Sequence, residues 1–373
     1  MPAVKNTGRL INLITGIQGV APGAPALINM LVNERDHRLN FQCTGIAYQP
    51  STAIVPATVD AGATFTPQIT NGRVTGVNIT GTVSTKADGT YALTITDPTG
   101  NGQGATGTYT VASHVVTSAA ITNSGVVSSV DPRVFFTALT HLVNGSVIRD
   151  ISPVDIIGIE SSCIGSGGGV VTPRAFGELP IYFTEPWRKI VNHDSATSWD
   201  LKGQNTYSIQ AQITANISSP GLTGTREFDY LRNGVTQRDA NGKPTGVNYF
   251  LSPIKQHAFS FNVPGGVYPI TTLPITYPIQ RLFVRSANAD ISYVELYQDG
   301  NKILEGTPGQ INQMYDDYGF VPGIYDFLFL SDVDQRLNNA LNVTPNGQLQ
   351  LKITTPGAEA VTVVMESRPP GFY

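Results

Sequence analysis

The chain alternates apolar and polar residues over many short stretches, which is typical of β-strands with one buried face. Residues 206–214 (TYSIQAQIT) and 349–355 (LQLKITT) both follow this two-residue period. The aromatic-rich runs 179–183 (LPIYF) and 325–330 (YDFLFL) also predict strands. The pattern therefore predicts an all-β chain.

Short helices are expected after the two aromatic-rich strands. Thr184 and Asp332 are suitable N-caps, and Val333, Leu337 and Leu341 recur at helical spacing. Glu185 then lies in a first helical turn, where the helix dipole favours a carboxylate by about 0.3–1 kcal/mol. The alternative is that Glu185 is a catalytic acid at a strand end.

The chain contains an internal duplication. Residues 139–157 (LTHLVNGSVIRDISPVDII) align with 294–312 (VELYQDGNKILEGTPGQIN), and 37–45 (HRLNFQCTG) aligns with 279–287 (IQRLFVRSA). Asn-Gly and Asp-Gly at matching positions predict tight hairpin turns. Each copy is thus expected to contain a strand, a turn, a second strand and a Ser/Thr-Pro corner. The first copy carries an extra segment, 46–133, between strands that are neighbours in the second copy.

This extra segment has its own composition and its own repeat. Threonine, glycine, valine and alanine dominate it, and residues 63–80 (ATFTPQITNGRVTGVNIT) align with 105–122 (ATGTYTVASHVVTSAAIT). We expect a small β-domain that grows out of a surface loop, where insertions cost little stability. Two interpretations remain open for it: a passive surface decoration, or a module that contacts host glycans.

Composition narrows the function. Apolar residues make up 40% and charged residues 13% of the 373 residues, with 38 glycines and 25 prolines, as in a turn-rich β-protein. The net charge is −4 and no basic run occurs, so direct nucleic-acid binding is not expected. Glycines and prolines interrupt the uncharged stretch 10–33, which argues against a spanning helix and favours a soluble, cytosolic protein. Cys43 and Cys163 are too few for a disulfide framework.

Candidate chemistry is sparse. His193, Asp194 and Ser195 are triad residue types, but adjacent residues cannot adopt triad geometry. The glycine-rich loop 165–169 lacks the lysine and hydroxyl residues of a phosphate-binding loop. The five histidines lack zinc-ligand spacing, and Asp316-Asp317 lacks the spacing of a calcium loop. We therefore assign no catalytic, cofactor or metal residue, with a structural calcium ion left as an alternative.

Several segments carry a resemblance to a known family. They are RLINLI (9–14), VELYQDGNKIL (294–304), INQMYDDYG (311–319), YDFLFLSDVDQRLNNAL (325–341) and VVMESRPPGFY (363–373). Their order and spacing resemble the double jelly-roll major capsid proteins of tailless, membrane-containing icosahedral phages, the corticovirus and tectivirus lineage. The likeness covers residues 268–373 well and the first half more loosely. The inserted 46–133 and the segment 218–262 depart from the family pattern.

The resemblance implies a fold and a domain plan. The fold would be two tandem eight-stranded jelly rolls, each with a short helix between late strands, plus the inserted β-rich domain. Residues 8–45 and 134–217 would form the first roll, and 263–373 the second. Residues 46–133 would form an outward tower. Residues 218–262 would connect the rolls, as a second outward loop or as an arm that clasps a neighbour.

The resemblance also implies a function. Such bacteriophage proteins self-assemble as homotrimers, and these pseudo-hexagonal tiles cover an icosahedral shell over an internal membrane. Expected partners are further copies of the chain, a vertex (penton) protein, the internal viral membrane near Lys5 and Arg9, and host-surface glycans through the tower. The protein would be made and assembled in the host cytoplasm, reside in the virion capsid and catalyse nothing. The alternative is a carbohydrate-binding adhesin or viral spike.

Overall fold

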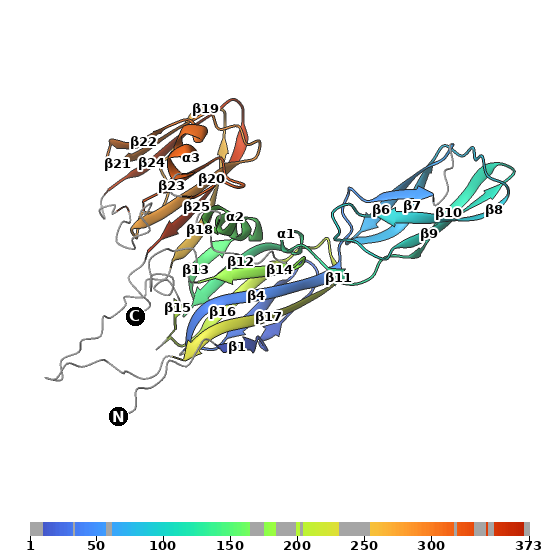
Figure 1. Cartoon of the computed structure of the whole chain (residues 1–373), viewed down its shortest axis with the longest axis horizontal. Coiled ribbons are helices and arrows are strands. Elements are labelled where there is room, and N and C mark those ends of the chain that lie inside the picture. Colours follow the sequence, from blue (N-terminus) through green and yellow to red (C-terminus); the bar gives the residue numbers. More distant parts are fainter. Residues whose placement is uncertain are drawn as a thin grey trace.

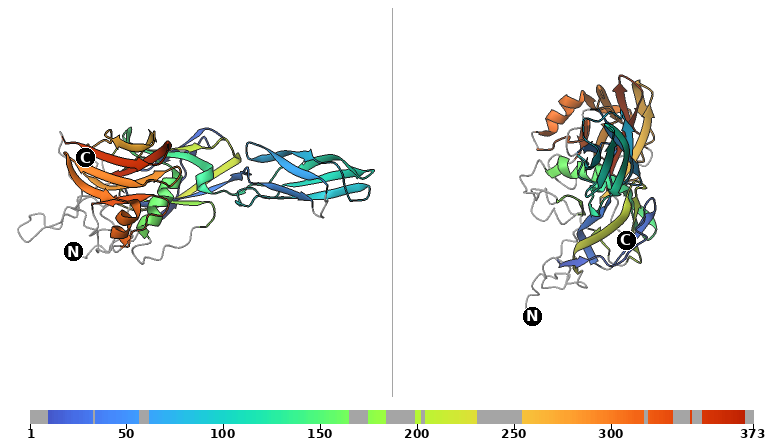
Figure 2. Two further views of the ribbon diagram at one scale, coloured as in Figure 1. Left: turned by 90° about the horizontal axis from the view of Figure 1, so that it is seen from above. Right: turned by 90° about the vertical axis from the view of Figure 1, so that its right-hand side faces the viewer.

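The protein has an elongated shape in which two β-rolls lie side by side and a slender β-domain projects from one of them (Figure 1). Seen from above, the slender domain points away from both rolls along the long axis (Figure 2). The computed structural model describes residues 10–32, 34–56, 62–164, 175–183, 199–201, 204–230, 254–316, 319–331, 341 and 347–368.

Strands form most of the first half of the chain. In chain order they are β1 (Leu10–Leu13), β2 (Ile17–Gln18), β3 (Pro25–Met30), β4 (Glu34–Ile46), β5 (Ala53–Pro56), β6 (Thr64–Thr70), β7 (Arg73–Thr80), β8 (Gly89–Thr96), β9 (Thr106–Ala112), β10 (Val115–Asn123), β11 (Ser128–Ser129), β12 (Phe136–Val143), β13 (Ser146–Ile151), β14 (Glu178–Tyr182), β15 (Trp199–Asp200), β16 (Tyr207–Ile213) and β17 (Ser218–Tyr230).

The second half adds eight strands, and three helices are described along the chain. The strands are β18 (Lys255–Val263), β19 (Gly266–Ile270), β20 (Ile279–Ser286), β21 (Tyr293–Gln298), β22 (Asn301–Gly306), β23 (Phe327–Leu330), β24 (Leu349–Thr355) and β25 (Glu359–Ser367). The helices are α1 (Pro132–Phe135), α2 (Pro153–Ile164) and α3 (Pro308–Asp316).

The two rolls share one strand order. In the first roll, one sheet runs β1-β17-β4-β14 and the other β3-β16-β12-β13. In the second roll, the sheets run β18-β25-β20-β23 and β19-β24-β21-β22. Counted within each roll, both have the order first-eighth-third-sixth in one sheet and second-seventh-fourth-fifth in the other. This is the arrangement of an eight-stranded jelly roll, so the all-β, two-roll fold expected from the sequence is confirmed.

The register of the hairpins shows how closely the rolls repeat. Asn144 and Gly145 join β12 to β13 with φ of 49° and 76°, and Asp299 and Gly300 join β21 to β22 with φ of 50° and 79°. Both turns have the positive φ angles that the Asn-Gly and Asp-Gly signals predict. The ladders even share an irregularity at the same place, between His141 and Leu142 and between their counterparts in β21.

The Ser/Thr-Pro corners differ from the sequence-based expectation because each begins a helix. Ser152 accepts a hydrogen bond from the backbone N–H of Asp155 and donates one to its carboxylate. At the start of α3, the Thr307 hydroxyl accepts from the Gln310 N–H, and the Gln310 side-chain oxygen accepts from both the N–H and the hydroxyl of Thr307. A Ser/Thr residue paired with an acid or amide three residues later is a capping box, and proline is favoured at the first helical position. The helix lies between the fifth and sixth strand of each roll.

Two other sequence-based assignments need correction. Residues 218–262 are not only a connection, since 218–230 form the last strand of the first roll and 255–263 the first strand of the second. Gly221 and Gly224 lie within this last strand, at positions where β17 approaches side chains of β4 closely. A Cβ atom on Gly224 would lie 2.8 Å from the Phe41 ring. Leu341 makes a β-bridge with Ile279, so no helix continues through it; residues 332–340 lie outside the described part.

The inserted segment forms a separate body with its own core. Its strands make a four-stranded sheet, β10-β9-β8-β5, and a hairpin, β6-β7. Ten buried residues centred on Phe65, Leu93 and Tyr109 form a hydrophobic cluster distinct from the one that runs through both rolls. The hairpins β6-β7 and β9-β10 correspond to the internal repeat seen in the sequence. We refer to this body as the tower; it comprises residues 46–130, slightly fewer than the 46–133 expected, because Asp131 caps α1 and α1 packs with the first roll.

Candidate functional site: the junctions between rolls and tower

The residues considered for catalysis do not come together as a site. Glu185, His193–Ser195 and the loop 165–169 lie outside the described residues, as does Asp317. Cys43 and Cys163 are buried in the first roll, and burial raises the pKa of Cys43 well above its usual value. Within the described ranges, no three His, Cys, Asp or Glu side chains lie close enough together to hold a metal ion. No helix there is long and apolar enough to cross a membrane.

The most elaborate polar structure lies where the two rolls meet. Strand β13 of the first roll pairs in parallel with β18 of the second, placing Arg149 opposite Gln256 and Asp150 opposite His257. This short ladder joins two four-stranded sheets, one from each roll, into a nine-stranded sheet that also includes β2. The rolls are therefore connected edge to edge through backbone hydrogen bonds.

Helix α2 reinforces the junction from the first roll. Its residues Asp155, Gly158 and Ile159 are buried. At its C-terminal end, the carbonyl of Ser162 accepts a hydrogen bond from the Val321 N–H (3.1 Å), and the Ser162 hydroxyl donates to the Pro322 carbonyl (3.1 Å). These bonds satisfy polar groups of the last helical turn, which otherwise lack partners within the helix.

A buried ion pair crosses the junction. The Arg285 guanidinium on β20 donates to both oxygens of Asp155, at 2.9 and 3.3 Å. Tyr325 donates its hydroxyl to the Asp155 backbone carbonyl (3.1 Å), and burial raises the pKa of that tyrosine well above its usual value. Asp155 is 1% exposed, so its charge depends on these partners.

A second cluster of charge lies beside the β13-β18 ladder. Arg149 is buried, donates to the Tyr182 carbonyl (3.2 Å) and lies over the rings of Phe183 and Trp199. Burial lowers the pKa of Arg149 to about 10, so it remains a cation at neutral pH. Across the ladder, the Glu366 carboxylate accepts hydrogen bonds from Gln256 (2.5 Å) and Arg281 (3.1 Å). The interface between the rolls therefore combines charge with close packing.

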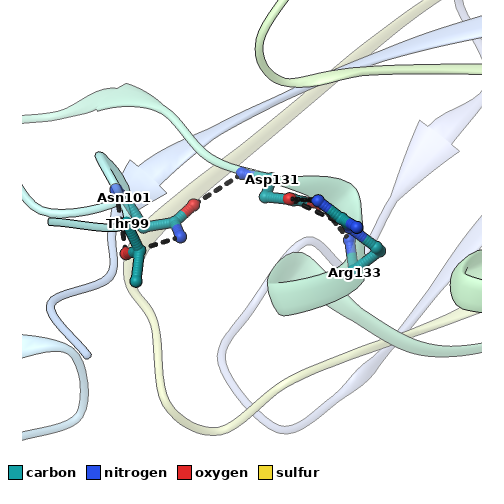
Figure 3. A network of polar contacts seen from close by, with 4 residues as sticks. All are labelled: Thr99, Asn101, Asp131 and Arg133. Carbon is teal, nitrogen blue, oxygen red and sulfur yellow. Dashed lines mark hydrogen bonds and ion pairs between the residues drawn. The ribbon is translucent and has the colours of Figure 1, made fainter. Parts of the chain in front are cut away.

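The tower is joined to the first roll by a chain of polar contacts near α1 (Figure 3). Asp131 caps α1 and pairs with Arg133, while its backbone N–H donates to the side chain of Asn101 (2.7 Å). Asn101 in turn donates to the Thr99 hydroxyl (3.0 Å) in the tower. Tyr48 lies nearby at the base of the tower, where its hydroxyl accepts from the Ala105 N–H (2.8 Å).

The tip of hairpin β6-β7 also rests against the roll. The carbonyl of Gly72 accepts a hydrogen bond from the Tyr48 N–H (2.8 Å), and Asn71 accepts one from the Ser218 hydroxyl (2.6 Å). Gly72 has a φ of 75°, and a Cβ atom there would lie 2.7 Å from the Asn216 carbonyl oxygen. The Asn-Gly sequence thus serves both the turn and the close approach of tower and roll.

Comparison with known proteins identifies the second roll by sequence and the whole chain by fold. Residues 253–368 match the family model of the viral coat protein P2 C-terminal domain. The crystal structure of the major capsid protein P2 from bacteriophage PM2 is similar with a TM-score of 0.61 and 13% identity, covering 98% of this chain and 100% of that one. The chain has the double jelly-roll fold of viral capsid proteins. The resemblance seen in the sequence is thereby confirmed.

Two further solved structures extend the likeness beyond phages. The atomic structure of Sulfolobus turreted icosahedral virus has a TM-score of 0.55 at 10% identity, covering 97% of this chain and 91% of that one. The PBCV-1 virus capsid has a TM-score of 0.51 at 9% identity, covering 99% and 95%. No curated protein matches the chain by sequence. The shared feature is the fold.

Sequence reasoning missed the residues of the roll junction. Asp155, Arg285 and Glu366 come from distant parts of the chain, and no local pattern predicts that they meet. The capping boxes SPVD (152–155) and TPGQ (307–310) are a local sequence signal that predicts the starts of α2 and α3.

Proposed function

We propose that this chain is the major capsid protein of an icosahedral virus and acts as a structural building block. The observation that carries the proposal is the pair of rolls with the same strand order, joined edge to edge, in a chain whose whole length corresponds to the PM2 major capsid protein. Three copies with two rolls each place six similar rolls around one axis. Such a tile approximates a hexagon and can cover a flat facet.

The tower fits the same role. It extends away from both rolls and has its own core, so it adds surface without altering the roll packing (Figure 2). We infer that it faces outward from the shell, where a contact with host glycans would occur. We further propose, from the family resemblance, that a vertex protein and an internal membrane are additional partners, and that assembly takes place in the host cytoplasm.

The test is the mass and shape of the purified protein. Light scattering behind a sizing column should give about three times the chain mass of 39.8 kDa, and negative stain should show hexagonal particles with protrusions. A stable monomer across the accessible concentration range would refute the proposal. Glycan-array binding by the intact protein that is lost when the tower is removed would favour a receptor-binding role for the tower.

A further inference from the structure

The two rolls correspond strand for strand, so every residue at the junction between them has a counterpart elsewhere in the chain. In the hairpins, Arg149 corresponds to Leu304, because both lie at the same step of matching ladders. In the sheets that contain β4 and β20, the ion pairs Arg38–Glu227 and Arg281–Glu366 occupy equivalent positions. These registers also make Ile11 on β1 the counterpart of Gln256 on β18.

On the helices, the counterparts of the junction residues are exposed. On α2, Asp155, Gly158 and Ile159 are buried against the second roll, whereas Gln310, Gln313 and Met314 at the same positions of α3 are exposed. Ile159 is 4% exposed and Met314 is 55% exposed. The face of α2 that packs against the second roll is therefore buried, whereas the corresponding face of α3 is exposed.

The edge strands of the two rolls differ in the same way as the helices: paired at the internal junction and unpaired at the corresponding outer edges of the described sheets. Within the described residues, β22 and β1 are terminal strands of their sheets, while their counterparts β13 and β18 pair with each other. Strand β1 carries Ile11 and Leu13, which are 65% and 75% exposed. An apolar strand with a free edge invites pairing with another chain.

We propose that β1 of a second copy docks on β22 and α3 in the same way that β18 docks on β13 and α2. The pairing would be parallel, with Leu304 opposite Ile11 and Glu305 opposite Asn12 of the second copy. Gln256, Ile156 and Ile159 line one small cavity at the internal junction. By correspondence, Ile11 of the second copy packs against Ile311 and Met314.

The side chains of the two faces are chemically matched. The buried Arg149 and Gln256 of the internal junction are replaced by the apolar Leu304 and Ile11. The positions of Asp155 and Arg285 correspond to Gln310 and Gln42, since Gln42 follows Arg38 by four residues as Arg285 follows Arg281. Both counterparts are neutral amides, and Gln42 already donates to the Ser129 hydroxyl (3.3 Å), so neither leaves a buried charge. Both members of these two pairs change together, so neither pair leaves a buried charge without its partner.

A contact of this kind is head-to-tail, because one chain offers two different surfaces. Each copy binds one neighbour through β22 and α3 and the other through β1, which closes into a ring when the rotation permits. This inference rests on the proposed assembly of the chain into trimers and identifies the surfaces that make it.

Cysteine cross-linking tests the contact directly. The native thiols Cys43 and Cys163 are both 0% exposed, so the full-length protein offers a low background. A chain with Ile11→Cys and Met314→Cys, treated with a short bismaleimide, should give covalent oligomers up to a trimer. The matched control pairs Ile11→Cys with Val267→Cys, which is 67% exposed on β19 and outside the proposed contact; it should stay monomeric in denaturing gels.

The outcomes separate this contact from the assembly itself. A trimer by light scattering that gives no cross-link between positions 11 and 314 would overturn the contact and leave the proposed function standing. A monomer by light scattering would overturn both. Cross-linking at both pairs alike would show non-specific collision and also overturn the contact.

A charge placed in the contact provides an independent measurement. Met314→Asp should weaken trimer association by roughly 30-fold per contact, the effect of removing an interface hot spot, while Met314→Leu should have little effect. Because Met314 is more than half exposed in the single chain, both variants should fold as the parent does. Equal association of the aspartate variant and the parent would overturn the proposal.

Discussion

Replacing Gly72 and Gly145 with alanine separates the cost of a backbone angle from the cost of a contact. Both residues occupy the same place in an Asn-Gly turn, with φ of 75° and 76°. A non-glycine residue in this left-handed region costs about 1–2 kcal/mol. Gly145 faces open space, with no atom within 4 Å of an added Cβ. Its substitution should therefore cost only the conformational part.

At Gly72 the same methyl group meets two backbone carbonyl oxygens, of Ile46 and Asn216. Neither oxygen can rotate away as a side chain does, so the turn has to shift relative to the roll. Overpacking of this kind costs about 1–3 kcal/mol in addition, which predicts a total of about 2–5 kcal/mol for Gly72→Ala. The shift also breaks the bond from the Tyr48 N–H to the Gly72 carbonyl.

Two measurements check this prediction in the full-length protein. Urea unfolding should show a larger loss of stability for Gly72→Ala than for Gly145→Ala. Hydrogen exchange should show lost protection of the Tyr48 amide in the first variant only. Equal losses of stability and an unchanged Tyr48 amide would refute the close packing of the hairpin turn between Tyr48 at the tower base and Asn216 of the roll.

Four further substitutions test the same structure. His114 lies in a tower turn with φ of 60°, which glycine adopts without strain. His114→Gly should therefore stabilise the protein by about 1 kcal/mol and raise its melting temperature, and a lower melting temperature would contradict the assignment of strain. Arg285→Met should cost about 3 kcal/mol in urea unfolding because it leaves the buried Asp155 charge unpaired, whereas Asp155→Asn should cost less because Arg285 is partly exposed; the reverse order would refute this account. Burial, then the charge of Arg149, lowers the pKa of His141 well below its usual value. The unfolded chain therefore binds a proton below about pH 6.5 that the folded chain does not, so stability should fall as the pH drops from 7 to 5. His141→Gln should reduce that slope in urea titrations, and an unchanged slope would show that other groups cause it.

Local signals in the sequence were sufficient for the turns and the duplication. Asn-Gly and Asp-Gly predict positive φ because few other residues tolerate it, and the two roll hairpins have such angles. The change in composition at residue 46 also predicted a separate domain, and the structure gives this segment a hydrophobic core of its own.

Longer-range features were not accessible in this way. Strand β17 contains Pro220, Gly221 and Gly224, which suggest a loop until the crowding by β4 is known. Burial on both faces of β23 gives a continuous apolar run that local pattern alone cannot assign to one partner. The partners of Asp155 depend on how the rolls meet, which follows from the fold and not from neighbouring residues.

The divergence between the two copies of the repeat follows from how each junction forms. The internal junction forms within one chain, where the partners are covalently linked, so the desolvation of Asp155 and Arg149 is offset during folding by partners that cannot diffuse apart. A junction between separate chains has to recover its full desolvation cost from association itself. Apolar contacts such as Leu304 against Ile11 achieve this with less cost than buried charges. Under the proposed assembly, a contact between molecules favours the neutral Leu304 and Gln310 of the second roll over the charged Arg149 and Asp155 at the same positions of the first roll.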